Sequence, residues 1–409
     1  MPKLLIDVRP LRESKQFRLL YAGNVVSSIG SQVTVVAAPF QVYLITHSSL
    51  WVGLLGLAQV IPLIGGSLIG GALADAHDRR RVLLLAQVLL GATSLGLALN
   101  AGLSHPQVWI IFLLTTLQAA FSGLDRPTRS AATPSLVGPI RLPAALALNQ
   151  LVLQLSIVVG PAIGGVLIAK VSLASAYLVD AGSFAFAFVA VLLMHPMLPE
   201  GGGTPASARS IVEGVRFLKG RQALQGTFVI DINAMVFGMP RALFPALGLT
   251  VFGGGAATVG LLYSAPGAGA LLGAITSGWV SRVDRQGRAT ILAVIAWGVS
   301  IAAFGLTSWL PLALFFLALA GASDVVSAVF RNTILQLSVP DSLRGRLSSI
   351  HIAVVTGGPR VGDAESGLVA AATNPSFAVV SGGLACVVGA VAIARLMPKL
   401  TDWRLQDHE

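Results

Sequence analysis

Long apolar segments recur along almost the whole chain, and they limit the possible fold more than any other feature. Twelve such segments can be counted in the 409 residues. Each is close to the length of about 20 apolar residues that crosses the hydrocarbon core of a bilayer as a helix. The sequence therefore predicts an all-α integral membrane protein with twelve transmembrane helices. The expected segments are 18–45, 51–74, 82–103, 107–124, 144–169, 175–194, 224–247, 257–280, 290–308, 311–330, 348–372 and 376–396.

The composition excludes the two other broad classes. Hydrophobic residues make up 55% of the chain and charged residues 11%, whereas soluble domains usually carry about 25% charged residues. A soluble protein would have too little charge to cover its surface, and intrinsic disorder requires low hydrophobicity. The 45 glycines suit membrane helices, which pack closely through small residues.

The basic residues indicate the orientation. Of the 27 Lys and Arg residues, 24 fall in the two ends and in alternate connections, and the exceptions are Lys170, Arg241 and Arg360. Cytoplasmic loops of membrane proteins carry this excess. We therefore expect a multi-pass protein of a bacterial plasma membrane with both termini in the cytoplasm. The net charge of +10 is explained by topology, so nucleic acid is not an expected partner.

The two halves of the chain resemble each other. Gly53-Leu54-Leu55 recurs as Gly260-Leu261-Leu262, and Gly71 recurs as Gly278, at the same offset of 207 residues. Two parallel repeats are typical of transporters that bind substrate near the membrane midplane. We expect two pseudo-symmetric six-helix bundles and a linker, at 1–196, 197–223 and 224–409.

The linker predicts a short helix at the membrane surface. Ser210 and Glu213 have the spacing of a capping box, and Ile211, Val215 and Leu218 then share one helical face. The glycines at 201–203 are not followed by the Lys-Ser/Thr of a phosphate-binding loop.

The connection after the second segment resembles the signature loop of the major facilitator superfamily. The matching residues are Gly71, Asp75, Arg79 and Arg80. The resemblance implies a twelve-helix transporter fold and a gate latch in which Asp75 meets a basic group or a helix N-terminus, and Gly71 would allow close helix approach. The alternative is a basic cluster that only sets topology. Asp78 stands where the family usually has glycine, and Arg282 replaces the aspartate in the second-half copy.

A second motif lies in the fifth segment, where Gly160, Pro161, Gly164 and Gly165 form Gly-Pro-x-x-Gly-Gly. It resembles the antiporter motif of exporters in the same superfamily. Proline removes one backbone hydrogen bond and glycines leave a smooth face, so the helix can bend and pack tightly. The resemblance favours export over import, and simple helix packing is the alternative.

Segments 119–131, 231–245 and 357–367 are similar to the enterobactin-exporter branch of this superfamily, and the similarity runs over nearly the whole chain. It implies export of a siderophore or another bulky amphipathic compound against inward proton flow. One departure concerns Thr115, which stands where many superfamily antiporters carry an arginine. Proton coupling through that arginine is therefore not expected.

Acidic residues inside the predicted spans are the candidates for proton coupling, because ionisable groups in a membrane are costly and mark function. Glu365 and Asp363 lie in one span, and Arg360 is placed three residues before Asp363 to pair with it. The unpaired Glu365 suits proton carriage best. The other candidates are Asp231 and Asp324, the latter on one face with Arg331. Structural ion pairs or an outer polar patch are the alternatives.

Polar residues in the spans are the candidates for a substrate cavity. They are Asn24, Gln41 and Gln59 from the first half, with Asn233, Arg241 and Arg360 from the second. Helix-to-helix hydrogen bonding is the alternative role for such amides. Asp125 and Asp180 are expected near opposite membrane edges, in structural roles.

Metal, cofactor and enzymatic chemistry find no support in the sequence. The six histidines have no ligand spacing, His351 is expected to be a packed neutral side chain, and Cys386 is the only cysteine. No catalytic motif is visible. We expect a monomeric exporter of a small amphipathic compound, driven by protons across the lipid bilayer. The alternatives are a broad-specificity multidrug pump, which 17 phenylalanines would permit, a nutrient importer, or a non-transporting sensor or enzyme.

Overall fold

The computed structural model describes residues 7–198 and 216–408, and every regular element among them is helical. Contacts divide the chain into two compact units. Of the described residues, the first unit contains 7–45, 58–198 and 255–260, and the second contains 46–57, 216–254 and 261–408. Residues 46–57 thus belong to the second unit although they lie in the first half of the chain. Residues 255–260 belong to the first unit although they lie in the second half.

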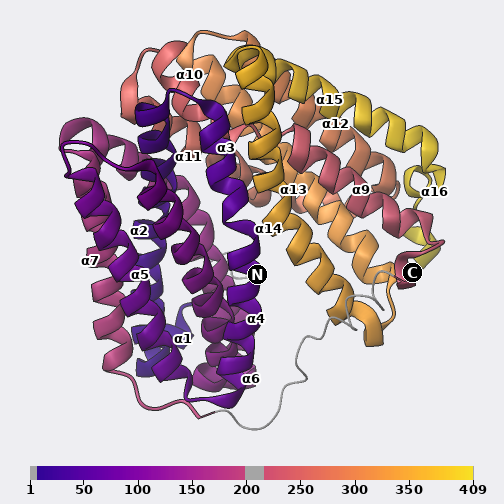
Figure 1. Ribbon diagram of the computed structural model, residues 1–409. Coiled ribbons are helices and arrows are strands. Elements are labelled where there is room, and N and C mark those ends of the chain that lie inside the picture. Colours follow the sequence, from indigo (N-terminus) through magenta and orange to yellow (C-terminus); the bar gives the residue numbers. More distant parts are fainter. Residues whose placement is uncertain (1–6, 199–215, 409) are drawn as a thin grey trace. The chain divides into compact units, whose positions relative to one another are not determined.

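The first unit is a bundle of long helices, drawn from indigo to magenta in Figure 1. Its elements are α1 (Arg9–Glu13), α2 (Lys15–Thr46), α4 (Val60–Ala76), α5 (Arg79–Ala101), α6 (Val108–Lys170) and α7 (Leu173–Leu192). Side chains cap two of them: Asp78 accepts a hydrogen bond from the Arg80 N–H at the start of α5, and Ser172 accepts one from the Ser175 N–H at the start of α7.

Helix α6 contains two of the predicted segments, 107–124 and 144–169, in 63 residues. At Gly138 the backbone has φ 69° and ψ 170°, which is not helical. Glycine adopts a positive φ without the strain that a Cβ would cause. The chain therefore changes direction at this residue, and α6 acts as two helices.

The second unit contains the remaining helices. They are α3 (Ser49–Ala58), α9 (Gln222–Phe237), η1 (Arg241–Leu243), α10 (Phe244–Thr250), α11 (Gly255–Ile275), η2 (Ser277–Arg282), α12 (Gln286–Leu306), α13 (Leu310–Ser338), α14 (Asp341–Ala372), α15 (Pro375–Leu396), α16 (Pro398–Thr401) and η3 (Gln406–His408). The first six residues of α11 and the last residue of α3 are grouped with the first unit.

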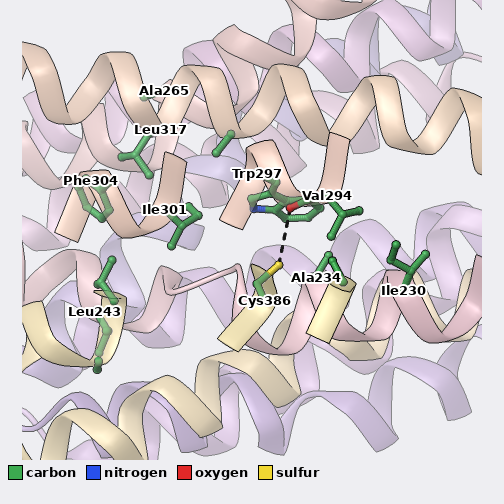
Figure 2. Packing of buried hydrophobic residues seen from close by; sticks show 14 of the residues in the cluster. Ile230, Ala234, Leu243, Ala265, Val294, Trp297, Ile301, Phe304, Leu317 and Cys386 are labelled. Carbon is green, nitrogen blue, oxygen red and sulfur yellow. Dashed lines mark hydrogen bonds between the residues drawn. The ribbon is translucent and has the colours of Figure 1, made fainter. Parts of the chain in front are cut away.

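An apolar core fills the second unit, and Figure 2 shows part of it. Trp297 is 2% exposed and donates its indole N–H to the Gly238 carbonyl at 2.9 Å. The thiol of Cys386 points at the Val294 carbonyl, 3.9 Å away. These two buried polar groups therefore each have a backbone acceptor, as a low-dielectric interior favours.

Ten helices of the described residues are long and apolar enough to cross a membrane, which makes the chain a multi-pass membrane protein. The segment predicted at 51–74 is divided by a turn at Gln59 into α3 and α4. Helix α14 covers the segment predicted at 348–372 but is not among the ten, and it carries Arg360, Asp363 and Glu365. The number twelve stays a prediction. Most of the predicted linker helix, with Ser210 and Glu213, lies outside the described residues.

Candidate functional site

The first unit encloses a cavity of about 530 Å³. Helices α2, α5, both parts of α6, and α7 line it. The lining residues are Leu20, Asn24, Ser27, Ser28, Ser31, Gln32, Val35, Leu90, Ser122, Asp125, Arg126, Arg129, Ser130, Thr133, Leu146, Asn149, Gln150, Leu153, Ser156 and Phe184. Hydroxyl and amide side chains are frequent among them, and Val35, the leucines and one aromatic ring provide apolar surface.

Helix α2 presents a polar stripe to this cavity. Asn24, Ser27, Ser28 and Ser31 have the spacing i, i+3, i+4 and i+7, which places them on one helical face. Ser28 donates to the Asn24 side-chain oxygen at 3.2 Å, and Ser31 donates to the Ser27 carbonyl at 2.8 Å. Sequence reasoning selected Asn24 alone, although the serine spacing was available as a signal.

The part of the wall that α6 contributes carries charge. Asp125 and Arg129 form an ion pair at 2.6 Å, and the Gln87 amide donates to the other Asp125 oxygen at 2.7 Å. Nη1 of Arg129 is buried without a hydrogen-bond partner in the described part of the chain. Arg126 is exposed and adds a second cation to the lining. Asp125 thus makes the structural contacts expected of it and also lines the cavity.

The two other amides predicted in the first half do not line this cavity. Gln41 is 2% exposed and accepts a hydrogen bond from the Tyr177 hydroxyl at 2.8 Å, so it joins α2 to α7. Gln59 lies in the turn before α4. Helix-to-helix bonding, the alternative for such amides, describes Gln41.

In the second unit, Arg331 of α13 lies at the centre of a buried charge cluster. Its guanidinium is 2.8 Å from Asp231 of α9 and 3.8 Å from Asp324, and it donates to the Ser327 hydroxyl at 2.9 Å. His351 of α14 lies with Nδ1 3.9 Å from Asp231. The shared face of Asp324 and Arg331 was predicted, but the shorter pairing with Asp231 crosses between helices and was not.

The two acids of α14 have different surroundings. The Asp363 carboxylate accepts a hydrogen bond from the Ala242 N–H at 2.9 Å, and its backbone lies against Gly53 of α3. Arg360 donates to the Thr356 carbonyl at 2.9 Å. Glu365 is half-buried and makes no ion pair or hydrogen bond with a described residue. Asp363 therefore joins α14 to η1, whereas Glu365 makes no such contact with a described residue.

The other candidates from the second half also make internal contacts. The Asn233 amide donates to the Cys386 carbonyl at 2.9 Å and is 9% exposed, so it joins α9 to α15. The Arg241 carbonyl accepts a hydrogen bond from the Tyr263 hydroxyl at 3.0 Å. Among the described residues, no three His, Cys, Asp or Glu side chains are grouped to hold a metal ion.

The predicted gate loop is tied to the end of α7. Arg80 donates to the carbonyls of Val191 and Leu192, at 3.3 and 2.6 Å, and so caps that helix. Asp78 accepts a second hydrogen bond, from the Met197 N–H at 2.8 Å. The aspartate that departs from the family pattern is therefore the structural one, because Asp75 is exposed and has no bonded partner in the described residues.

Close helix approach at this loop does not occur at Gly71, where an added Cβ would meet nothing within 4 Å. It occurs at neighbouring glycines instead. A Cβ at Gly70 would lie 2.7 Å from the Leu124 Cα, and one at Gly66 would overlap the Ala120 carbonyl. The prediction that Gly71 allows close helix approach was therefore wrong. Helix α4 packs on α6 through Gly66 and Gly70 instead.

The Gly-Pro-x-x-Gly-Gly motif faces two neighbours. Gly160 and Gly164 pack on α2, where added Cβ atoms would strike Gln32 and lie 3.1 Å from the Val33 Cα. Gly165 packs on the first turns of α11, where an added Cβ would lie 2.9 Å from the Gly260 Cα. Glycine is required here because backbones meet without room for a side chain.

Sequence reasoning missed a buried polar cluster around Asp180, which was expected near a membrane edge. Asp180 is 0% exposed and belongs to α7. One of its oxygens, Oδ2, accepts hydrogen bonds from Thr34 at 2.7 Å, Ser94 at 2.8 Å and Gln118 at 3.2 Å. The donors come from α2, α5 and α6, so a sequence without contacts could not have grouped them.

Comparison with known proteins places this geometry in a family. A family model described as transmembrane secretion effector matches residues 7–408. The enterobactin exporter EntS of Citrobacter koseri is 30% identical over 401 residues, which cover 98% of this chain and 96% of that protein.

Solved structures agree on the fold. A crystal structure of the nucleoside transporter NupG has a TM-score of 0.77 at 12% identity, and the match covers 93% of this chain and 99% of the other. A bacterial homologue of the human lysosomal transporter Spinster has a TM-score of 0.72 at 16% identity and covers 98% and 99%. The helices therefore have the transporter arrangement that the repeats and motifs predicted.

Proposed function

Because the chain belongs to the transmembrane secretion effector family of the major facilitator superfamily, we propose that it exports a siderophore or a similar amphipathic organic compound across a bacterial plasma membrane. The family is one of membrane transporters rather than enzymes. The proposed transport mode is alternating access of two six-helix halves, 1–196 and 224–409, which the linker 197–223 joins. Similarity to the enterobactin exporter over 98% of the chain supports this substrate class.

The cavity of the first unit is the proposed substrate site, and its mixed wall is the observation that carries the proposal. The hydroxyl oxygens of the α2 stripe can accept hydrogen bonds from substrate donors, because their own hydrogens are donated within α2. The exposed Arg126 offers hydrogen bonds to substrate oxygens. Leu90, Leu153 and Phe184 offer apolar contact. A few directed polar groups within an apolar frame are typical of small-molecule sites.

Protons are the proposed energy source, with export against inward proton flow. Glu365 is the proposed carrier in the second unit, because it is half-buried in α14 and no described side chain bonds to it. Asp363, Asp231 and Asp324 are the other candidate acids of that unit, and each contacts a described donor or cation. We further propose that the protein acts as a monomer with both termini in the cytoplasm.

Flux in purified proteoliposomes tests the function. A pH gradient is imposed, and movement of enterobactin is compared with movement of ethidium, a cationic amphipathic dye. Gradient-dependent movement of enterobactin alone is the expected result. Movement of the dye, with or without enterobactin, would favour the multidrug pump, and movement of neither would contradict the proposal.

A matched pair of variants links the cavity to that flux. Ser28→Ala removes one hydroxyl of the α2 stripe and should raise the half-saturation concentration of enterobactin by about 5- to 10-fold, as expected for one lost hydrogen bond of about 1 kcal/mol or more. Ser175→Ala removes a half-buried serine of α7 outside the cavity and should not change the half-saturation concentration. Equal values for both variants would remove the stripe from the substrate site.

A further inference from the structure

The Asp180 cluster lies one helical turn from the cavity on every helix that builds it. The cluster residues are Thr34, Ser94, Gln118 and Asp180, and the cavity-lining residues on the same helices are Ser31, Leu90, Ser122 and Phe184. Each pair is three or four residues apart, so its members share one face of α2, α5, α6 or α7. Each of the four helices thus contributes one residue to the cavity wall and, one turn away, one residue to a polar layer at the Asp180 carboxyl group.

The direction is the same on all four helices. From the cavity layer, the cluster lies toward the C-terminal end of α2 and α5 and toward the N-terminal end of α6 and α7. Under the proposed topology these ends face the exterior. The carboxyl group therefore lies between the outer surface of the first unit and its cavity.

Among the described residues, no cation bonds to this carboxyl group. Its neighbours there are the Thr34, Ser94 and Gln118 donors and the Ser183 hydroxyl, which donates to the Asp180 backbone carbonyl. The only other titratable side chain of the described part that interacts with it is Tyr177, whose hydroxyl donates to Gln41. An ionised acid inside a membrane normally pairs with a cation. Three neutral donors on Oδ2 leave Oδ1 buried and without a described partner, so a proton is the ligand that this oxygen can take.

Gly30 of α2 leaves room for the Ser183 hydroxyl beside Oδ1. A Cβ at this position would lie 3.1 Å from Oδ1 and would overlap the Ser183 hydroxyl. A side chain at position 30 would displace this hydroxyl and crowd Oδ1, so glycine preserves the surroundings of the carboxyl group.

We propose that Asp180 is a protonation site of the first unit, and that its protonation is coupled to occupation of the adjacent cavity. A proton from exterior water forms an O–H bond at Oδ1 and neutralises the carboxylate, and the proton leaves to cytoplasmic water when the first unit faces inward. No oxidant or other reactant is needed. The coupling to export depends on the proposed function, whereas the protonation itself does not.

Infrared difference spectra across a pH titration test the protonation directly on the purified protein in detergent. The wild type is expected to show the carbonyl stretch of a protonated carboxyl that Asp180→Asn lacks and that the exposed control Asp402→Asn retains. Ser94→Ala should shift that band, because Ser94 donates to this carboxyl group. This variant keeps the test valid if Asp180→Asn does not fold. A spectrum in which neither variant changes a band would overturn the site.

Transport tests the coupling. In proteoliposomes, Asp180→Asn should slow gradient-driven movement of enterobactin by about tenfold while its exchange without a gradient stays within about twofold, because a coupling free energy is lost and binding is kept. Gradient-driven movement at the wild-type rate would overturn the coupling. If the wild type moves neither enterobactin nor ethidium, the proposed function fails, and the infrared titration still decides the protonation site.

Discussion

At the scale of single residues, the two aspartates of the gate loop have different roles. Asp78 accepts two backbone hydrogen bonds and caps α5, whereas Asp75, three residues earlier, is exposed and has no bonded partner in the described residues. The family resemblance marked Asp75 and treated Asp78 as a departure. The contacts explain the departure: an aspartate here ties α5 to the chain that follows α7.

Asp78→Ala should therefore lower the stability of the protein. Loss of an N-cap costs about 1–2 kcal/mol of unfolding free energy, and the Met197 N–H also loses its acceptor. Thermal unfolding in detergent measures the effect as a lower midpoint. Asp75→Asn should leave that midpoint unchanged and slow transport, as a gate latch requires. A stability loss in Asp75→Asn, or none in Asp78→Ala, would reverse these assignments.

Glu365→Gln tests the proton carrier proposed for the second unit. The amide keeps the size of the side chain and cannot release a proton, so gradient-driven export should be lost while binding of enterobactin is retained. Flux and equilibrium binding measure the two properties separately. Normal gradient-driven export by the variant would exclude Glu365 from the mechanism.

At the scale of helices, glycines decide which elements can touch. Gly160 and Gly164 let α6 pack on α2, and Gly66 and Gly70 let α4 pack on α6. Lipid supplies no hydrophobic drive between helices, so this close approach contributes much of the association. The motif in the fifth segment has a packing role in the structure, and its role in export remains the proposal made from the family resemblance.

Gly160→Ala should destabilise the first unit. The added Cβ would overlap the Gln32 side chain and lie 3.0 Å from the Ile29 carbonyl, and overpacking of this kind costs about 1–3 kcal/mol. The matched control is Gly182→Ala in α7, where an added Cβ would meet nothing within 4 Å. Thermal midpoints of the two variants in detergent should differ, with only Gly160→Ala lowered. Equal midpoints would show that α2 and α6 can separate at no cost.

At the scale of the whole molecule, the arrangement of basic residues predicts the orientation of the protein in the membrane. Introduced cysteines can report this orientation, because the chain has only one cysteine of its own. Cys386 is buried, so it should react little with a membrane-impermeant maleimide. Ser104→Cys, in the loop before α6, should be labelled in intact cells. Asp402→Cys, after α16, should be labelled only when the membrane is permeabilised. Labelling of both in intact cells would contradict cytoplasmic termini.

The amino-acid sequence alone determined the class of the protein and its superfamily, and it indicated most of the membrane segments. Crossing a membrane is a local property, because each span satisfies its own backbone hydrogen bonds and needs only length and hydropathy. Gly71 shows the limit of such reasoning, since the motif identified the loop but misplaced the close contact by one residue. A one-residue difference turns a side chain to another face of the helix.

Only the tertiary structure decided which polar side chains meet. Thr34 and Asp180 are 146 residues apart in sequence, and Ser94 and Asp180 are 86 apart, yet both donors share one carboxylate oxygen. Arg331 likewise takes Asp231 of another helix as its nearest acid. The rotation of each helix about its own axis sets these contacts, and packing against several neighbours, rather than the local sequence, sets the rotation.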